Sequence, residues 1–179
     1  MDVVGESITY FGGKQCYNAL ELGAQQVAKL ASAGFGSENM KTLEKDFNTC
    51  APIADQWDMG IFSSNVMGNL QGTVQYNNER TGVWNVTDVC EVMLGSNSST
   101  AEAPSQQQSY LNLAKLSAIF AKQGGADCED ASYKATIDYL ASTNADPSNA
   151  ARPWVYQTCN EFGYVNMEIW RYGLCCMYV

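Results

Sequence analysis

Apolar and small residues recur at helical spacing along most of this 179-residue chain. Between Gly13 and Ala33 they are separated by steps of four and three, which describes one face of a helix. No run alternates apolar and polar residues as a half-buried strand does. The chain is therefore predicted to be all-α, with about six helices over these ranges: Gly13–Ala33, Ser37–Cys50, Asp55–Tyr76, Thr87–Leu94, Tyr110–Lys122 and Ala131–Ser142.

The segments between these helices have the composition of loops. Tyr76–Gly82 is rich in turn-forming residues, and Gly95–Ser109 is rich in Ser, Gln and small residues, so it is predicted to be a surface linker. Glu129 and Asp130 come just before the last of these helices. We interpret them as acidic residues that stabilise a helix start through the backbone dipole.

The composition is that of one globular domain. Hydrophobic residues make up 46% of the chain and charged residues 16%, and the formal net charge is −9. A negative field repels phosphate backbones and anionic lipid, so a nucleic-acid or membrane-surface role is disfavoured. No apolar run reaches the roughly 18 residues of a membrane span.

The cysteines favour an oxidising compartment. Five of the seven are spread at gaps of roughly 30 to 40 residues, with no C-x-x-C pair and no histidine to complete a zinc site. Asn85 and Asn97 each begin an N-glycosylation motif, which points the same way. The alternative is a cytosolic protein with buried free thiols. The first ten residues do not resemble a secretion signal, a contradiction that is resolved if the chain is a fragment.

The absence of histidine excludes several kinds of catalysis by this chain alone. Neither a Ser-His-Asp triad nor a Cys-His pair can be assembled, and no G-x-S-x-G nucleophile motif is present. No motif indicates a metal or an organic cofactor. A small helical enzyme that uses carboxylates has no motif support either.

An aromatic-rich motif near the end of the chain resembles a known family. The block W-x-Y-Q-T-C-x-E-F-G-Y, Trp154–Tyr164, is similar to one in the lysosomal prolyl carboxypeptidase and dipeptidyl peptidase II family of serine exopeptidases. The resemblance covers Val3–Tyr164, and four further blocks occur in the family's order: QCYNAL (Gln15–Leu20), FNTCAPI (Phe47–Ile53), VQYN (Val74–Asn77) and DVCEVM (Asp88–Met93).

This resemblance implies a particular part of the family's fold. Its members carry a helical cap inserted into an α/β-hydrolase domain, between the nucleophilic Ser and the later Asp and His. The chain resembles that cap over residues 1–164, with 152–164 as the return segment, whereas 165–179 diverges from the family. We therefore expect a fragment that lacks its catalytic hydrolase domain and is inactive on its own.

The resemblance also implies disulfide partners and roles for the motif. It pairs Cys16 with Cys90 and Cys50 with Cys128, and it leaves Cys159 without its usual partner. Trp154, Tyr156, Gln157 and Glu161 could contact a substrate beneath the cap. The alternative, which we favour, is that they anchor the cap to the hydrolase core.

The function implied is part of a proline-directed serine exopeptidase, either a carboxypeptidase or a dipeptidyl peptidase. The full-length parent would be a secreted or lysosomal hydrolase that cuts peptides near proline and needs no cofactor. The alternative is a non-catalytic secreted helical module that binds a peptide or a protein partner.

Overall fold

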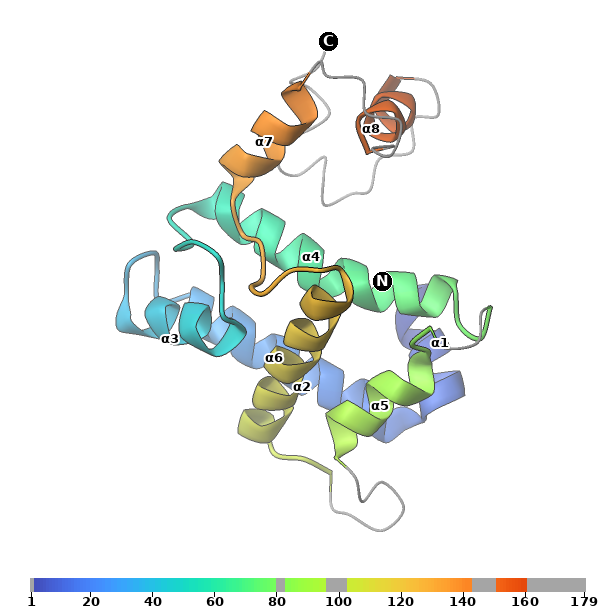
Figure 1. The fold of residues 1–179 in the computed structure, drawn as a ribbon. Helices are drawn as coiled ribbons and strands as arrows, with labels where there is room; N and C mark the ends of the chain where they lie inside the picture. Colours follow the sequence, from blue (N-terminus) through green and yellow to red (C-terminus); the bar gives the residue numbers. More distant parts are fainter. Residues whose placement is uncertain (1, 80–82, 96–102, 143–150, 161–179) are drawn as a thin grey trace.

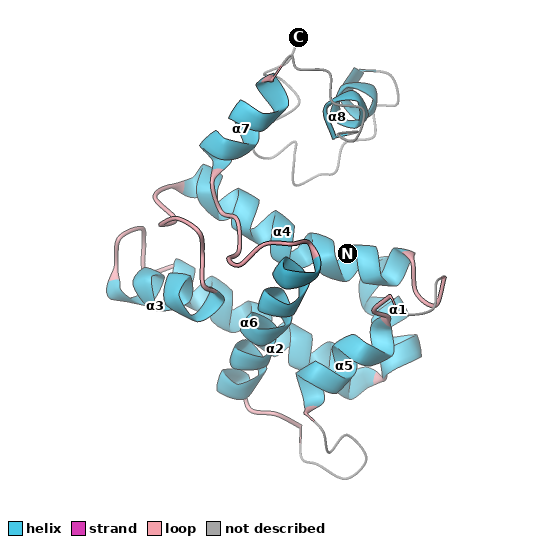
Figure 2. Cartoon of the chain, in the orientation of Figure 1, coloured by secondary structure: helices cyan, strands magenta, loops and turns pink. Residues whose placement is uncertain are grey.

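A computed structural model describes residues 2–79, 83–95, 103–142 and 151–160 of the protein. Within these ranges the chain forms helices joined by loops and no strand, which confirms the predicted all-α class (Figure 2). Figure 1 shows the arrangement of the helices: α1 (Asp2–Gly12), α2 (Lys14–Ala31), α3 (Glu38–Phe47), α4 (Gln56–Gln75), α5 (Val86–Leu94), α6 (Gln106–Gln123), α7 (Tyr133–Ala141) and α8 (Ala151–Asn160).

The described residues contain two helices beyond the six that the apolar spacing predicts. In α1 only a narrow stripe is buried: Ile8 lies in the core and Val4 packs against the core one turn earlier, whereas Val3, Tyr10 and Phe11 are exposed. In α8 a proline stands at the third position, which a pattern search takes as a break. Pro153 is tolerated there because the N–H groups of the first helical turn have no intrahelical partner to lose.

Two predicted boundaries are wrong. α3 ends at Phe47 rather than near Cys50, because Asn48 adopts a left-handed conformation with φ of 50°. The linker predicted over Gly95–Ser109 is helical from Gln106 onward, since the Ser105 side chain caps α6 by accepting a hydrogen bond from the Gln108 N–H at 3.2 Å. Residues 96–102 of that segment lie outside the described part.

The centre of the fold is the crossing of α2 and α6 (Figure 1). The two backbones approach closely at Gly23, where a Cβ atom would lie 2.9 Å from the carbonyl oxygen of Ser109. Aromatic rings continue the core beside this crossing. The ring of Phe47 meets those of Phe62 and Tyr110 edge to face, with centroids 5.0 and 5.8 Å away.

Two disulfides join elements that are distant in sequence. Cys16–Cys90 links α2 to α5, and Cys50–Cys128 links the segment after α3 to the segment before α7. These are the two pairs that the family resemblance implies. Gly12 packs directly against the first of them, because a Cβ atom at that position would lie 2.2 Å from the Cys90 sulfur.

Helices α7 and α8 lie at one end of the molecule, beyond α4 (Figure 1). The start of α7 is held to the start of α4, where the Tyr133 N–H donates to Asp58 Oδ1 at 3.0 Å. The Trp57 and Tyr133 rings also meet there, with centroids 5.4 Å apart. α8 packs against α7, so the motif that it carries is placed at the edge of the bundle rather than in its core.

Candidate functional site

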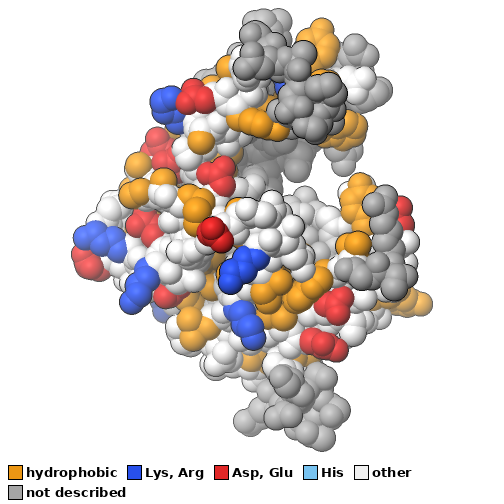
Figure 3. Space-filling view, viewed as in Figure 1, with side chains coloured by type: hydrophobic (Ala, Val, Ile, Leu, Met, Phe, Trp, Pro, Cys, Tyr) orange, Lys and Arg blue, Asp and Glu red, His pale blue; other side chains and the backbone are white. Residues whose placement is uncertain are grey.

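Three of the four candidate residues lie on α8, and all three are exposed. Trp154 is 57% exposed and Tyr156 is 56% exposed, although aromatic side chains are usually well buried in folded domains. Gln157 is exposed as well, whereas Thr158 turns inward and is buried. Glu161 lies outside the described residues. The exposed apolar surface at this end of the molecule is visible in Figure 3.

The helix places the two aromatic rings on different sides. At 3.6 residues per turn, positions two apart are separated by about 160° around the helix axis, whereas positions three or four apart share a face. Trp154 therefore shares a face with Gln157, and Tyr156 shares one with Arg152. Trp154 and Tyr156 therefore cannot both contact the same flat face of a substrate or of a neighbouring domain.

A hydrogen bond fixes the start of α8 against the end of α7. Arg152 Nη1 donates to the carbonyl oxygen of Ser142, the residue that follows the last turn of α7, at 2.5 Å. A guanidinium group at the carboxyl end of a helix also complements the helix dipole. This contact holds the side of α8 that bears Tyr156 toward α7.

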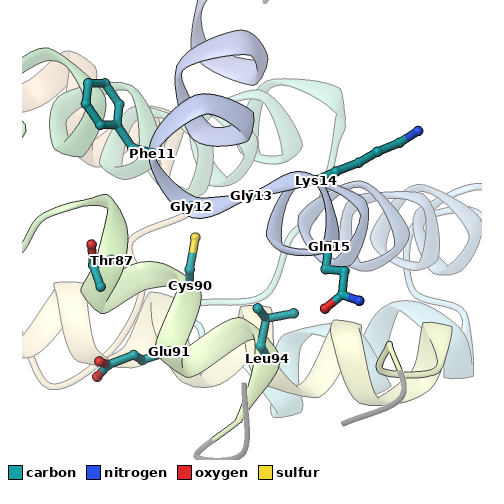
Figure 4. Close-up of a pocket in the computed structure, with 9 residues that line it drawn as sticks. All are labelled: Phe11, Gly12, Gly13, Lys14, Gln15, Thr87, Cys90, Glu91 and Leu94. Atoms are coloured by element: carbon teal, nitrogen blue, oxygen red, sulfur yellow. The ribbon is translucent and has the colours of Figure 1, made fainter. Parts of the chain in front are cut away.

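A separate pocket of about 420 Å³ lies where α1 meets α2 (Figure 4). Gly12 and Gly13 form the sharp connection between the two helices, and Gly13 has a φ of 83° that favours glycine. Cys90 and Leu94 of α5 line the opposite wall, while the Lys14 side chain points away from the pocket. One sulfur of the Cys16–Cys90 disulfide thus lines a pocket that opens to the surface. The residues that line this pocket do not form a catalytic arrangement.

A buried carboxyl group was missed by the sequence reasoning. Glu129, interpreted as a helix-start charge, is only 5% exposed and accepts a hydrogen bond from the Ser117 hydroxyl of α6. Burial raises the pKa of Glu129, the nearby charge of Asp130 raises it further, and the bond from Ser117 opposes the shift. Its backbone is also paired, since the Cys50 N–H donates to the Glu129 carbonyl at 2.9 Å.

A second polar pair fastens α6 to α3. The buried Tyr110 hydroxyl donates to Asp46 Oδ2 at 2.9 Å. Burial raises the pKa of Tyr110 strongly, and the hydrogen bond to the Asp46 carboxylate adds to the shift. Both polar pairs therefore support the fold rather than a reactive centre.

Of the remaining predicted residues, one lies in the described part of the chain and the others do not. Asn85 is the N-cap of α5. The Cys159 side chain, Asn97 and the tail 165–179 lie outside the described part. Among the described residues no group of three or more His, Cys, Asp or Glu could hold a metal ion, and no helix is long and apolar enough to cross a membrane.

Comparison with known proteins shows similarity to serine proteases. The chain is 29% identical to the thymus-specific serine protease of Mus musculus over 175 residues, and 27% identical to that of Homo sapiens over 172 residues. Each match covers 93% of this chain and 32% of the relative, so the chain spans about a third of the length of these relatives. No solved structure gives a significant match.

The match to a protein family extends over nearly the whole chain. The serine carboxypeptidase S28 family matches residues 1–168, which include all eight described helices and both disulfides. The chain belongs to the serine carboxypeptidase S28 family of serine peptidases.

Proposed function

We propose that this chain is the helical cap of a proline-directed serine exopeptidase, and that it covers the catalytic cleft of a hydrolase domain. The family match carries this proposal. The chain has no histidine, so a Ser-His-Asp triad must take at least that residue from elsewhere in a longer protein. Relatives about three times as long, named as serine proteases, are consistent with such a division.

Exposed aromatic residues on α7 and α8 support this end of the molecule as the contact with the hydrolase domain or the substrate. Trp154, Tyr156 and the α7 residue Tyr139 are each more than half exposed. Three large aromatic side chains exposed at one end of a domain favour a contact there with another protein surface, a substrate or a further domain. In the proposed enzyme, α8 lies against the catalytic domain, and the face of α8 that bears Trp154 and Gln157 lies nearest the peptide substrate or the domain contact.

The proposal includes an oxidising compartment for the full-length protein, either secreted or lysosomal. Two disulfides that each span more than 70 residues support it, because such bonds persist where thiols are not kept reduced. The substrate class, peptides with proline near the cut, rests on the family resemblance of the motif on α8.

The test is a chimera with its matched control. Residues 1–168 replace the corresponding third of the mouse relative, and the chimera is compared with this chain alone. We expect the chimera to react with a fluorophosphonate probe and to cleave prolyl peptides, and the isolated chain to do neither. Labelling and hydrolysis by the isolated chain would show that it is an enzyme by itself and would refute the proposal.

The alternative, a secreted helical module that binds a peptide or protein, has one observation in its favour. Helices α1 to α6 share one cluster of buried apolar residues, and two disulfides cross-link the chain, so this part has what a stable domain needs on its own. A chimera that folds but shows neither labelling nor cleavage, together with an isolated chain that stays monomeric and binds no hydrophobic dye, would favour this alternative.

A further inference from the structure

The start of α5 is closed by reciprocal hydrogen bonds around Asn85. Asn85 Oδ1 accepts from the backbone N–H groups of Thr87 at 2.8 Å and Asp88 at 3.2 Å. The Asp88 carboxylate in turn accepts from the Asn85 backbone N–H at 2.8 Å. This capping box satisfies donors that the first turn of a helix leaves unpaired.

The cap also fixes which side of the amide is free. Within the described residues no hydrogen bond is made by Asn85 Nδ2, and rotating the amide to exchange its two ends would break both bonds to Oδ1. The Thr87 side chain is exposed, and it stands at the edge of the pocket in Figure 4. Asn85 itself is half-buried and Val86 is buried, so the motif presents a partly exposed asparagine beside an exposed hydroxyl residue.

The surroundings of Asn85 are more apolar than a bare surface loop. Asn77 Oδ1 accepts from the Val86 N–H at 3.0 Å, which places the turn after α4 beside the start of α5. Tyr76 in that turn and Val83 just before Asn85 are each 52% exposed. A hydrophilic group at Asn85 would therefore stand near two exposed apolar side chains.

We propose that Asn85 is a glycosylation site that carries an N-linked oligosaccharide. Transfer forms a bond between Asn85 Nδ2 and C1 of the sugar, and it breaks the bond from C1 to the phosphate oxygen of a lipid-pyrophosphate-linked donor. Nδ2 gives up one proton, and the lipid pyrophosphate leaves. Oδ1 takes no part, so the product keeps both hydrogen bonds of the cap. This inference rests on the secretory compartment that the proposed function includes, but it does not depend on peptidase activity.

The first experiment measures occupancy by mass. The full chain, with a secretion signal added, is produced in a eukaryotic host with Asn97→Gln, which removes the other acceptor. We expect one glycan, released by peptide N-glycosidase, that survives Thr87→Ser and is lost with Thr87→Val. The exposed position of Thr87 makes both variants compatible with the fold. An Asn97→Gln protein without any glycan, or one that keeps its glycan with Thr87→Val, would overturn the proposal.

A second measurement tests the geometry of the cap. Peptide N-glycosidase leaves an aspartate in place of the acceptor asparagine, and aspartate caps a helix as well as asparagine does. We expect the urea midpoint to change little after enzymatic removal of the glycan, and to fall clearly with Asn85→Ala. If enzymatic removal lowers the midpoint as much as Asn85→Ala does, the glycan does not attach with the cap intact.

Discussion

Replacing Gly23 with alanine tests whether close contact between α2 and α6 organises the fold. A Cβ atom at this position would lie 2.9 Å from the Ser109 carbonyl oxygen and 3.3 Å from two side-chain carbons of Leu113. The nearest of these is a backbone atom, which cannot rotate away as a side chain can. Relief therefore requires the two helices to move apart or to shift along each other.

The chain offers a matched control at Gly68, which lies inside α4 with nothing within 4 Å of the added Cβ atom. In both positions alanine gains about 0.5–1 kcal/mol over glycine, because it loses less conformational freedom in a helix. Only Gly23→Ala meets the overpacking penalty, which is about 1–3 kcal/mol in well-packed cores. Gly68→Ala should thus stabilise the protein by ~0.5–1 kcal/mol, and Gly23→Ala should destabilise it by up to ~2 kcal/mol.

The measurement is urea unfolding of both variants with the disulfides intact, followed by far-ultraviolet circular dichroism. With a slope of about 2 kcal/mol per molar urea, a difference of about 2 kcal/mol between the variants separates their midpoints by about 1 M. If Gly23→Ala unfolds at the same midpoint as Gly68→Ala, the close approach of α2 and α6 does not contribute to stability and the reasoning is refuted.

Three further predictions concern the first disulfide and the buried acid. Replacing Cys16 and Cys90 together with serine should cost up to about 4.5 kcal/mol for a loop of this span, measured by urea unfolding under oxidising conditions. Gly12→Ala should destabilise the oxidised protein, and its cost should shrink in the Cys90→Ala background where the sulfur is gone, measured in a double-mutant cycle. For Glu129, whose pKa folding raises above its ordinary value of 4.5, the stability contribution is complete below pH 4.5 and is lost as pH rises through the folded value. Glu129→Gln should therefore remove this decline in unfolding free energy with pH, and an unchanged pH profile would contradict it.

The sequence predicts those helices that carry several large apolar residues on one face. It does not predict helices that are stabilised mainly by contacts with other parts of the fold. The range predicted over Asp55–Tyr76 agrees with α4 to within one residue at each end, because Asp55 caps the helix and several large apolar residues face the core. The apolar spacing does not predict α1, because this helix is stabilised by the packing of Ile8 against other helices. Propensity and periodicity do not report such contacts.

The same limit applies to the candidate site and the buried acid. The aromatic motif at Trp154 could be found from the sequence, but its exposure could not, because burial depends on what packs against α8. Glu129 looked like a helix-start charge because it comes just before α7. Its neighbour Asp130 does bond near that start, where Asp130 Oδ1 accepts from the N–H of Ser132, the N-cap residue of α7. The partner of Glu129 is Ser117, twelve residues earlier on α6, whereas Glu129 lies in the loop after α6, and no local rule connects the two.

The two exposed aromatic residues of α8 limit how the rest of the enzyme can meet the cap. Full burial of a large apolar side chain is worth about 1.5–3 kcal/mol. Trp154 and Tyr156 are each a little over half exposed, so covering both completely would contribute a further ~2–3 kcal/mol. They lie about 160° apart around the helix, so a flat surface can cover only one of them. If both contribute to the proposed contact, α8 must enter a groove with two walls. Trp154→Ala and Tyr156→Ala would then act on separate walls, and their effects on the stability of the chimera should add, whereas a shared wall would make them non-additive.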